Sequence, residues 1–157
     1  MENRVLTRGE RMKVLVVYDS AYGNTEKIAK AIAGALAGEV SVVRAKEVDP
    51  SGLQPAGALI VGSPTQGGTM TQPIQDFLSR VPETSIKGTK VAAFDTRMAG
   101  RFVKMFGFAA EKIAKNLEAR GGNLISPPEG FIVKGRKGPL KEGELERAAI
   151  WAKSLTV

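Results

Sequence analysis

Three side chains able to donate hydrogen bonds, those of Ser20, Asn24 and Thr25, lie within six residues of one another. Gly23 sits among them and lets the backbone turn sharply or approach a ligand closely. The segment 19–25 contains neither Lys nor Arg. This favours a phosphate held by neutral donors and argues against a nucleotide triphosphatase loop, which needs a Lys after its last Gly.

The elements on either side of this segment would position it for such a role. The apolar run 14–18 has no polar alternation, which suits a strand covered on both faces. Ile28, Ile32 and Leu36 then recur at helical spacing. A helix beginning here presents N–H groups without intrahelical acceptors and a partial positive charge, both of which favour an anion. In the alternative interpretation, Ser20 or Asn24 only caps the helix.

The composition restricts the chemistry further. The 157 residues, 43% of them hydrophobic, suffice for one domain with a core. The chain has no Cys and no His, which removes thiol nucleophiles, imidazole bases and the commonest zinc ligands, and a redox role therefore requires a bound cofactor. We predict no catalytic residue and no metal site. No apolar run approaches the roughly 20 residues that span a bilayer, and residues 1–11 lack the apolar centre of a signal peptide. We therefore expect a cytoplasmic protein with no membrane span.

The net charge of +7 is concentrated in the second half of the chain. Residues 81–157 carry fourteen Lys and Arg against eight Asp and Glu, whereas residues 1–80 carry nine against eight. Such an excess suits nucleic acid, an anionic membrane surface or an acidic protein. The charges are dispersed, and six Phe, two Tyr and one Trp offer few rings to stack on bases, so we expect no nucleic-acid partner.

Strand-like and helix-like segments alternate along the chain. The predicted strands are 14–19, 40–43, 58–62, 91–94 and a fifth in two pieces, 124–125 and 131–133; the predicted helices are 26–36, 73–80, 108–119 and 144–155. This alternation implies parallel strands joined by right-handed crossovers. We predict an α/β protein, a three-layer doubly wound five-stranded parallel sheet over residues 12–157, with residues 1–11 as an N-terminal extension.

Ligands of such a sheet bind beyond the carboxyl ends of the strands, where the strand order reverses. Three segments meet this condition: 19–25, 62–70 and 94–107. The second segment contains a proline, which restricts the backbone, and paired glycines, which allow it more conformations. The third offers an acid, a hydroxyl and a cation. We predict that the three segments converge on one ligand.

The stretch 16–32 resembles the strand, phosphate loop and helix of the flavodoxin family, and the similarity continues through Gly62-Ser63-Pro64-Thr65 to about residue 155. The resemblance implies the strand order 2-1-3-4-5 with FMN at the switch point, for which flavodoxin is itself a standard example. Only residues 126–130 separate the two pieces of the fifth strand, which resembles the short-chain form of the family.

The resemblance also implies where the parts of FMN bind. The residues around its 5′-phosphate would be Ser20, Ala21, Tyr22, Gly23, Asn24 and Thr25. Those beside the isoalloxazine ring, with a peptide at Gly67 or Gly68 free to flip, would be Pro64, Thr65, Gln66, Gly67 and Gly68. Those at the pyrimidine end would be Asp95, Thr96 and Arg97.

Two features depart from the family pattern. Typical flavodoxins are acidic and hold the ring between aromatic side chains, whereas segment 62–70 has no aromatic residue. The aromatic residues that the third segment offers are Phe94, Phe102 and Phe106. Soft thioether sulfur packs well against aromatic rings. The residues that we consider for covering the ring are therefore Met70, Met98 and Phe102.

The function implied is that of an electron carrier between a reductase and an acceptor protein. Arg97, Arg101 and Lys104 would ease full reduction, because that state is anionic, and would suit an acidic docking surface on the redox partner. Two alternatives stay open: an FMN-dependent quinone-type oxidoreductase, and a flavin-free interaction domain of the same fold. The intact phosphate loop argues against the second.

Overall fold

The computed structural model describes residues 13–53, 56–100 and 107–157. Its strands form one sheet in which all neighbouring strands run parallel. The strands are β1 (Lys13–Tyr18), β2 (Glu39–Arg44), β3 (Ala58–Pro64), β4 (Lys90–Met98), β5 (Asn123–Leu124) and β6 (Glu129–Val133). Their order is β2-β1-β3-β4-β5, and β6 also pairs with β4. The predicted order 2-1-3-4-5 is thus confirmed, with the fifth strand in two pieces.

Strand β4 is longer than the sequence indicates. We predicted its end at Phe94, yet it continues to Met98. The reason is non-local: β5 pairs with Lys90 and Val91 at one end of β4, and β6 pairs with the other end from Phe94 to Met98. The polar residues predicted for a loop, 95–97, are therefore fixed in a strand.

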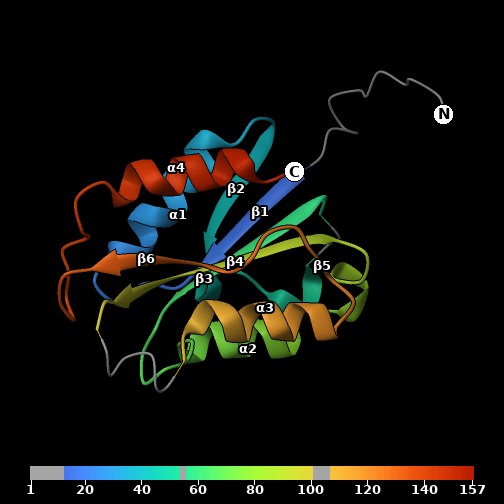
Figure 1. Ribbon diagram of the computed structural model, residues 1–157. Helices are drawn as coiled ribbons and strands as arrows, with labels where there is room; N and C mark the ends of the chain where they lie inside the picture. Colours follow the sequence, from blue (N-terminus) through green and yellow to red (C-terminus); the bar gives the residue numbers. More distant parts are fainter. Residues whose placement is uncertain (1–12, 54–55, 101–106) are drawn as a thin grey trace.

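In the described part of the chain, four α-helices cover the sheet: α1 (Asn24–Ala35), α2 (Gln72–Arg80), α3 (Ala109–Ala119) and α4 (Glu144–Ser154). Figure 1 shows α1 and α4 on one face and α2 and α3 on the other. Short 3-10 turns lie at Ala45–Glu47, Pro50–Gly52 and Glu83–Ser85. None of the helices within the described ranges has the length and apolar character needed to cross a membrane.

Each face of the sheet has its own apolar core. Helix α2 buries Ile74, Phe77 and Leu78, whose spacing places them on one side of the helix. On the opposite face, the rings of Phe94, Phe131 and Trp151 meet edge to face, with centroids 6.1 to 6.3 Å apart. The helices are thus held by burial of apolar surface on both sides of the strands.

The position of Phe94 removes it from the ligand edge. Gly62 on β3 makes room for this ring, because a Cβ at Gly62 would lie 2.0 Å from the Phe94 Cζ atom. Phe94 is fully buried in the core and does not serve as a stacking partner for a flavin. The other two aromatic residues of segment 94–107 are Phe106 and Phe102, the latter one of those considered for covering the ring, and both lie outside the described residues.

Candidate functional site

A pocket of about 380 Å³ opens at the carboxyl ends of β1, β3 and β4. This volume is within the range of small-molecule and cofactor sites. The residues that line it are Ser20, Ala21, Tyr22, Asn24, Thr25, Pro64, Thr65, Gln66, Gly67, Thr96, Arg97, Met98, Val133 and Arg136. The structure thus brings together eleven of the predicted site residues. Gly23, Gly68 and Asp95 do not line the pocket.

The start of helix α1 forms one wall of the pocket. Gly23 precedes the helix with a φ of +92°, a conformation that a side chain would strain. The Ser20 hydroxyl accepts hydrogen bonds from the N–H groups of Gly23, at 3.0 Å, and Glu26, at 3.4 Å. The N–H groups of Asn24 and Thr25 have no acceptor within the described part of the chain. Ser20 therefore caps the helix and still leaves two N–H groups for an anion.

Two contacts fix this helix start against distant segments. The Thr25 hydroxyl lies 2.7 Å from that of Thr96 on β4. The Asn24 side-chain amide donates a hydrogen bond of 3.2 Å to the Lys137 carbonyl. Asn24 and Thr25 are both buried. The wall is therefore held in place by the fold before a ligand arrives.

The second predicted segment forms a tight hairpin at the rim. Gln66 and Thr69 exchange two backbone hydrogen bonds, of 2.8 and 3.1 Å. Gly67 and Gly68 between them have φ values of +58° and +79°. Two consecutive positive φ values are the requirement of a type I′ turn, which accounts for the paired glycines. The Gly68 carbonyl accepts a hydrogen bond of 2.6 Å from Lys112 Nζ on α3, which ties the hairpin to that helix.

The Asp95 carboxylate is engaged inside the protein. It accepts hydrogen bonds from Arg97 Nε at 2.7 Å, from Arg97 Nη2 at 2.8 Å and from the Ala110 N–H at 2.9 Å. Burial raises the pKa of the Asp95 carboxyl, while the bonds from Arg97 and Ala110 act in the opposite direction. Asp95 is fully buried, so these bonds position Arg97 and α3.

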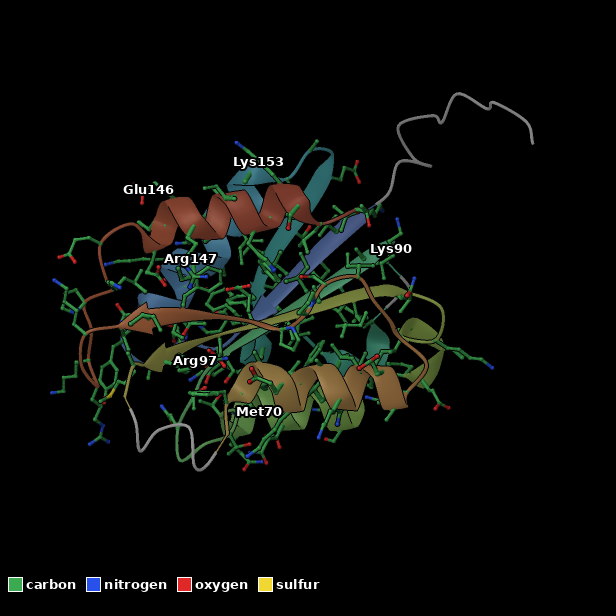
Figure 2. All side chains as sticks on the ribbon, viewed as in Figure 1. Met70, Lys90, Arg97, Glu146, Arg147 and Lys153 are labelled. Carbon is green, nitrogen blue, oxygen red and sulfur yellow. The ribbon has the colours of Figure 1, made fainter. Side chains whose placement is uncertain are left out.

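Arg97 lies between β4 and the start of α3 (Figure 2). Its guanidinium lies 3.6 Å from the centroid of the Phe108 ring and contacts Glu111 at 3.3 Å, in addition to Asp95. Two carboxylates thus offset its charge, so Arg97 adds little net positive charge to the pocket. Arg101 and Lys104, the other two cations that we predicted to ease full reduction of the flavin, lie outside the described residues.

Thr65 joins two of the predicted segments. Its N–H donates to the Thr96 carbonyl at 2.9 Å, and its hydroxyl accepts from the Ala109 N–H at 3.0 Å. Thr65 and Asp95 therefore satisfy the first N–H groups of α3, which is a capping arrangement. The rim of the pocket and helix α3 are positioned by the same side chains.

Three lining residues were absent from the predicted binding set. Met98 on β4 is paired with Val133 on β6. The predicted strand 91–94 ended before Met98, so this pairing was not expected. Met98, one of the residues considered for covering the ring, is in the pocket, whereas Met70 packs against the α2–α3 core. Arg136 follows β6, and no local pattern links it to segment 19–25.

The lining fits a phosphate-bearing aromatic ligand. Ser20, Asn24 and Thr25 supply polar donors, while Met98 and Val133 supply apolar surface. The lining residues include two arginines and, among those described, no Asp or Glu. An anionic phosphate therefore meets no lining carboxylate, and the residues present are chemically suited to FMN.

Comparison with known proteins identifies the family. The family model described as Flavodoxin matches residues 16–151. The chain belongs to the flavodoxin family. It is 24% identical over 152 residues to a flavodoxin of Clostridium saccharobutylicum, covering 92% of this chain and 95% of that one. A solved flavodoxin 2 of Bacillus cereus is 26% identical, with a TM-score of 0.77, covering 90% of this chain and 96% of that one.

A relative that is named as an enzyme is also similar. An NAD(P)H dehydrogenase (quinone) of Brucella anthropi is 27% identical over 150 residues, which are 81% of this chain and 75% of that protein. Membership of the flavodoxin family makes this chain an FMN-binding electron-transfer protein. The predictions of the family, the fold and the cofactor are confirmed.

Proposed function

We propose that this flavodoxin is an electron carrier that binds FMN in the pocket described above, with the phosphate at the start of α1. The observation that carries the proposal is the pair of N–H groups of Asn24 and Thr25, which lack acceptors in the described structure and belong to buried residues. Hydrogen bonds from N–H groups to an anion are stronger than those between neutral groups. The bound phosphate would therefore anchor the cofactor.

The remaining lining residues suit the rest of the cofactor. When bound, FMN supplies reversible electron transfer, which this chain lacks without it because it has no Cys and no His. Gly67, in the turn at the rim, and Met98, the last residue of β4, both line the pocket. We assign these two residues to the ring, and Tyr22, whose side chain is half exposed, to the outer edge of the phosphate site.

We assign a different role to Asp95. Its carboxylate is fully occupied by Arg97 and the Ala110 N–H and does not line the pocket. In this proposal Asp95 is a positioning residue that holds Arg97 at the pocket wall. Thr96 and Arg97 remain the residues nearest to the ligand in this segment, since both line the pocket.

The partner of such a carrier is expected to present an acidic surface, because the chain carries a net charge of +7. Attraction between opposite charges accelerates docking and weakens as salt is added. Stopped-flow measurement of electron transfer from an acidic reductase tests this point. The rate is expected to fall with rising ionic strength, and a rate independent of salt would contradict the acidic partner.

The carrier is distinguished from an enzyme by turnover. FMN-loaded protein is mixed with NADPH and a benzoquinone, with or without a separate flavodoxin reductase, and NADPH consumption is recorded. A carrier gives sustained consumption only when the reductase is present. Sustained consumption by the protein alone would contradict the carrier.

The second candidate function is that of an FMN-dependent quinone reductase. The observation in its favour is the similarity to the Brucella anthropi protein, which is named NAD(P)H dehydrogenase (quinone). Multiple turnovers without a reductase in the experiment above are the result that this function predicts.

A further inference from the structure

We propose that Arg136 supplies the phosphate site with the cation that segment 19–25 lacks. This inference rests on the proposed function, since the anion concerned is the 5′-phosphate of FMN. Arg136 lines the same pocket as Ser20, Asn24 and Thr25, although it lies more than a hundred residues further along the chain. The site would then bind phosphate by charge as well as by neutral donors.

The turn that carries Arg136 is well ordered by backbone hydrogen bonds. Val133 and Leu140 form an antiparallel bridge, and the Lys134 N–H donates to the Pro139 carbonyl at 2.9 Å. At the tip, the Gly138 N–H donates to the Gly135 carbonyl at 3.0 Å. Arg136 is therefore presented from a defined hairpin that directly follows β6.

The same hairpin is attached to the phosphate wall. The Lys137 carbonyl accepts the hydrogen bond from the Asn24 side chain, at 3.2 Å. Gly138 packs so closely that a Cβ there would lie 2.6 Å from the Asn24 amide nitrogen. Lys137 is hydrogen-bonded to Asn24, and Gly138 packs against the same side chain. The hairpin therefore places Arg136, which directly precedes them, beside the phosphate end of the pocket.

Arg136 also differs from the other described arginines in what it contacts. Arg44 pairs with Glu26, Arg80 with Asp49, Arg97 with Asp95 and Arg147 with Glu144. Arg120 donates to the carbonyls of Leu78 and Val81. Within the described residues, no carboxylate or carbonyl accepts a hydrogen bond or ion pair from Arg136. Its charge is thus not used by the part of the fold that the structure describes.

The neighbouring cations are less suited to the role. Lys134 forms an ion pair with Glu142, and Lys137 Nζ lies 6.0 Å from the centroid of the Tyr22 ring. Neither of these lysines, nor Lys141, is among the residues that line the pocket. Arg136 lines the pocket, has no partner for its guanidinium among residues 13–53, 56–100 and 107–157, and has the fork geometry that matches phosphate.

The test compares FMN with riboflavin, which lacks the phosphate. Apoprotein is titrated with each flavin, and flavin fluorescence quenching gives the two dissociation constants. In Arg136→Gln, we expect FMN binding to weaken about fivefold to fiftyfold, as befits a charged contact near solvent, and riboflavin binding to stay unchanged. Arg136→Lys should recover part of the loss. The salt dependence of FMN affinity should also be smaller in Arg136→Gln than in the wild type.

Lys141→Gln is the matched control, because it removes the same charge from the same hairpin at a residue that does not line the pocket. It should leave both dissociation constants near the wild-type values. Unchanged FMN binding in Arg136→Gln, or equal losses for FMN and riboflavin, would overturn the assignment of Arg136. If the wild type binds neither flavin, the proposed function itself fails and the assignment falls with it.

Discussion

The hydroxyl oxygens of Thr25 and Thr96 lie 2.7 Å apart and join the first turn of α1 to strand β4. Both residues are buried, so this hydrogen bond is shielded from water. It connects the wall that we assign to the phosphate with the strand that carries Arg97 and Met98. This bond thereby fixes the position of the α1 wall relative to strand β4.

Replacing Thr96 by Val should remove the hydrogen bond that attaches the start of α1 to β4. The substitution keeps the shape of the side chain but leaves the Thr25 hydroxyl without its partner in a buried position. We expect the free energy of unfolding in urea to fall by about 1 to 2 kcal/mol, and FMN affinity to fall with it. Thr84→Val, at an exposed threonine, should change neither quantity. Equal effects of the two substitutions would contradict the role of this bond.

The hairpin at the rim should depend on glycine at position 68. An Ala there must adopt a φ near +79°, which costs about 1 to 2 kcal/mol of stability. Gly34→Ala is the matched control, because Gly34 lies within α1 with nothing within 4 Å of an added Cβ. It should stabilise the protein by about 0.5 to 1 kcal/mol. Thermal or urea unfolding of both variants decides the matter, and a neutral Gly68→Ala would count against the type I′ turn.

Asp95 and Glu111 both contact Arg97 but should contribute very differently. Asp95→Asn leaves a largely buried guanidinium without its main partner, so we expect a loss of about 2 to 4 kcal/mol in unfolding free energy. The Glu111 side chain is 46% exposed, and Glu111→Gln should cost less than about 1 kcal/mol. Similar losses in urea unfolding would show that burial does not separate the two contacts.

Glu144 should contribute to the acid limb of the stability curve. Its carboxylate accepts hydrogen bonds from Arg147, which lies between α4 and β6 (Figure 2), and from the Ile132 N–H. The bond from Arg147 is the main reason why the pKa of Glu144 is lowered, and the Ile132 N–H adds to it against the effect of burial. A lowered folded-state pKa gives stability that is present above the unfolded value of about 4.3 and is lost as the pH falls through the folded value.

Glu144→Gln tests this dependence. The variant should be less stable at pH 7 by about 1 to 3 kcal/mol, because the partners of a buried carboxylate lose their charge-assisted bonds. The gap between wild type and variant should narrow as the pH falls below about 4.3. Urea unfolding from pH 3 to pH 7 provides both curves, and a gap that stays constant would contradict the assignment. Glu146→Gln, at an exposed position of the same helix, is the control.

The features that the sequence predicts are local ones. Apolar runs mark β1 and β3, helical spacing marks α1, and the position of segment 19–25 between them follows from adjacent residues. The paired glycines 67 and 68 likewise indicate a turn at the ligand edge. For these elements the physical cause, burial on two faces or a positive φ, is encoded within a few residues.

The features that escaped prediction depend on contacts between distant segments. Strand β4 continues to Met98 because β6 pairs with it, and Asp95 turns inward because Arg97 and the start of α3 surround it. Phe94 enters the core because Gly62 leaves space for its ring. Arg136 reaches the pocket because its hairpin is bonded to Asn24. No spacing within one segment reports these relationships.

FMN binding at the start of α1 is the property on which the proposed function of this protein most directly depends. The decisive measurement is a visible-absorption titration of apoprotein with FMN, after which unbound flavin is removed. It compares the wild type with Ser20→Ala/Thr25→Ala, and with Ser79→Ala/Thr84→Ala as a control that removes two hydroxyls away from the pocket. We predict one bound FMN in the wild type and the control, and much weaker binding in the first variant. A wild type that remains colourless, or a first variant that binds like the control, would contradict the account.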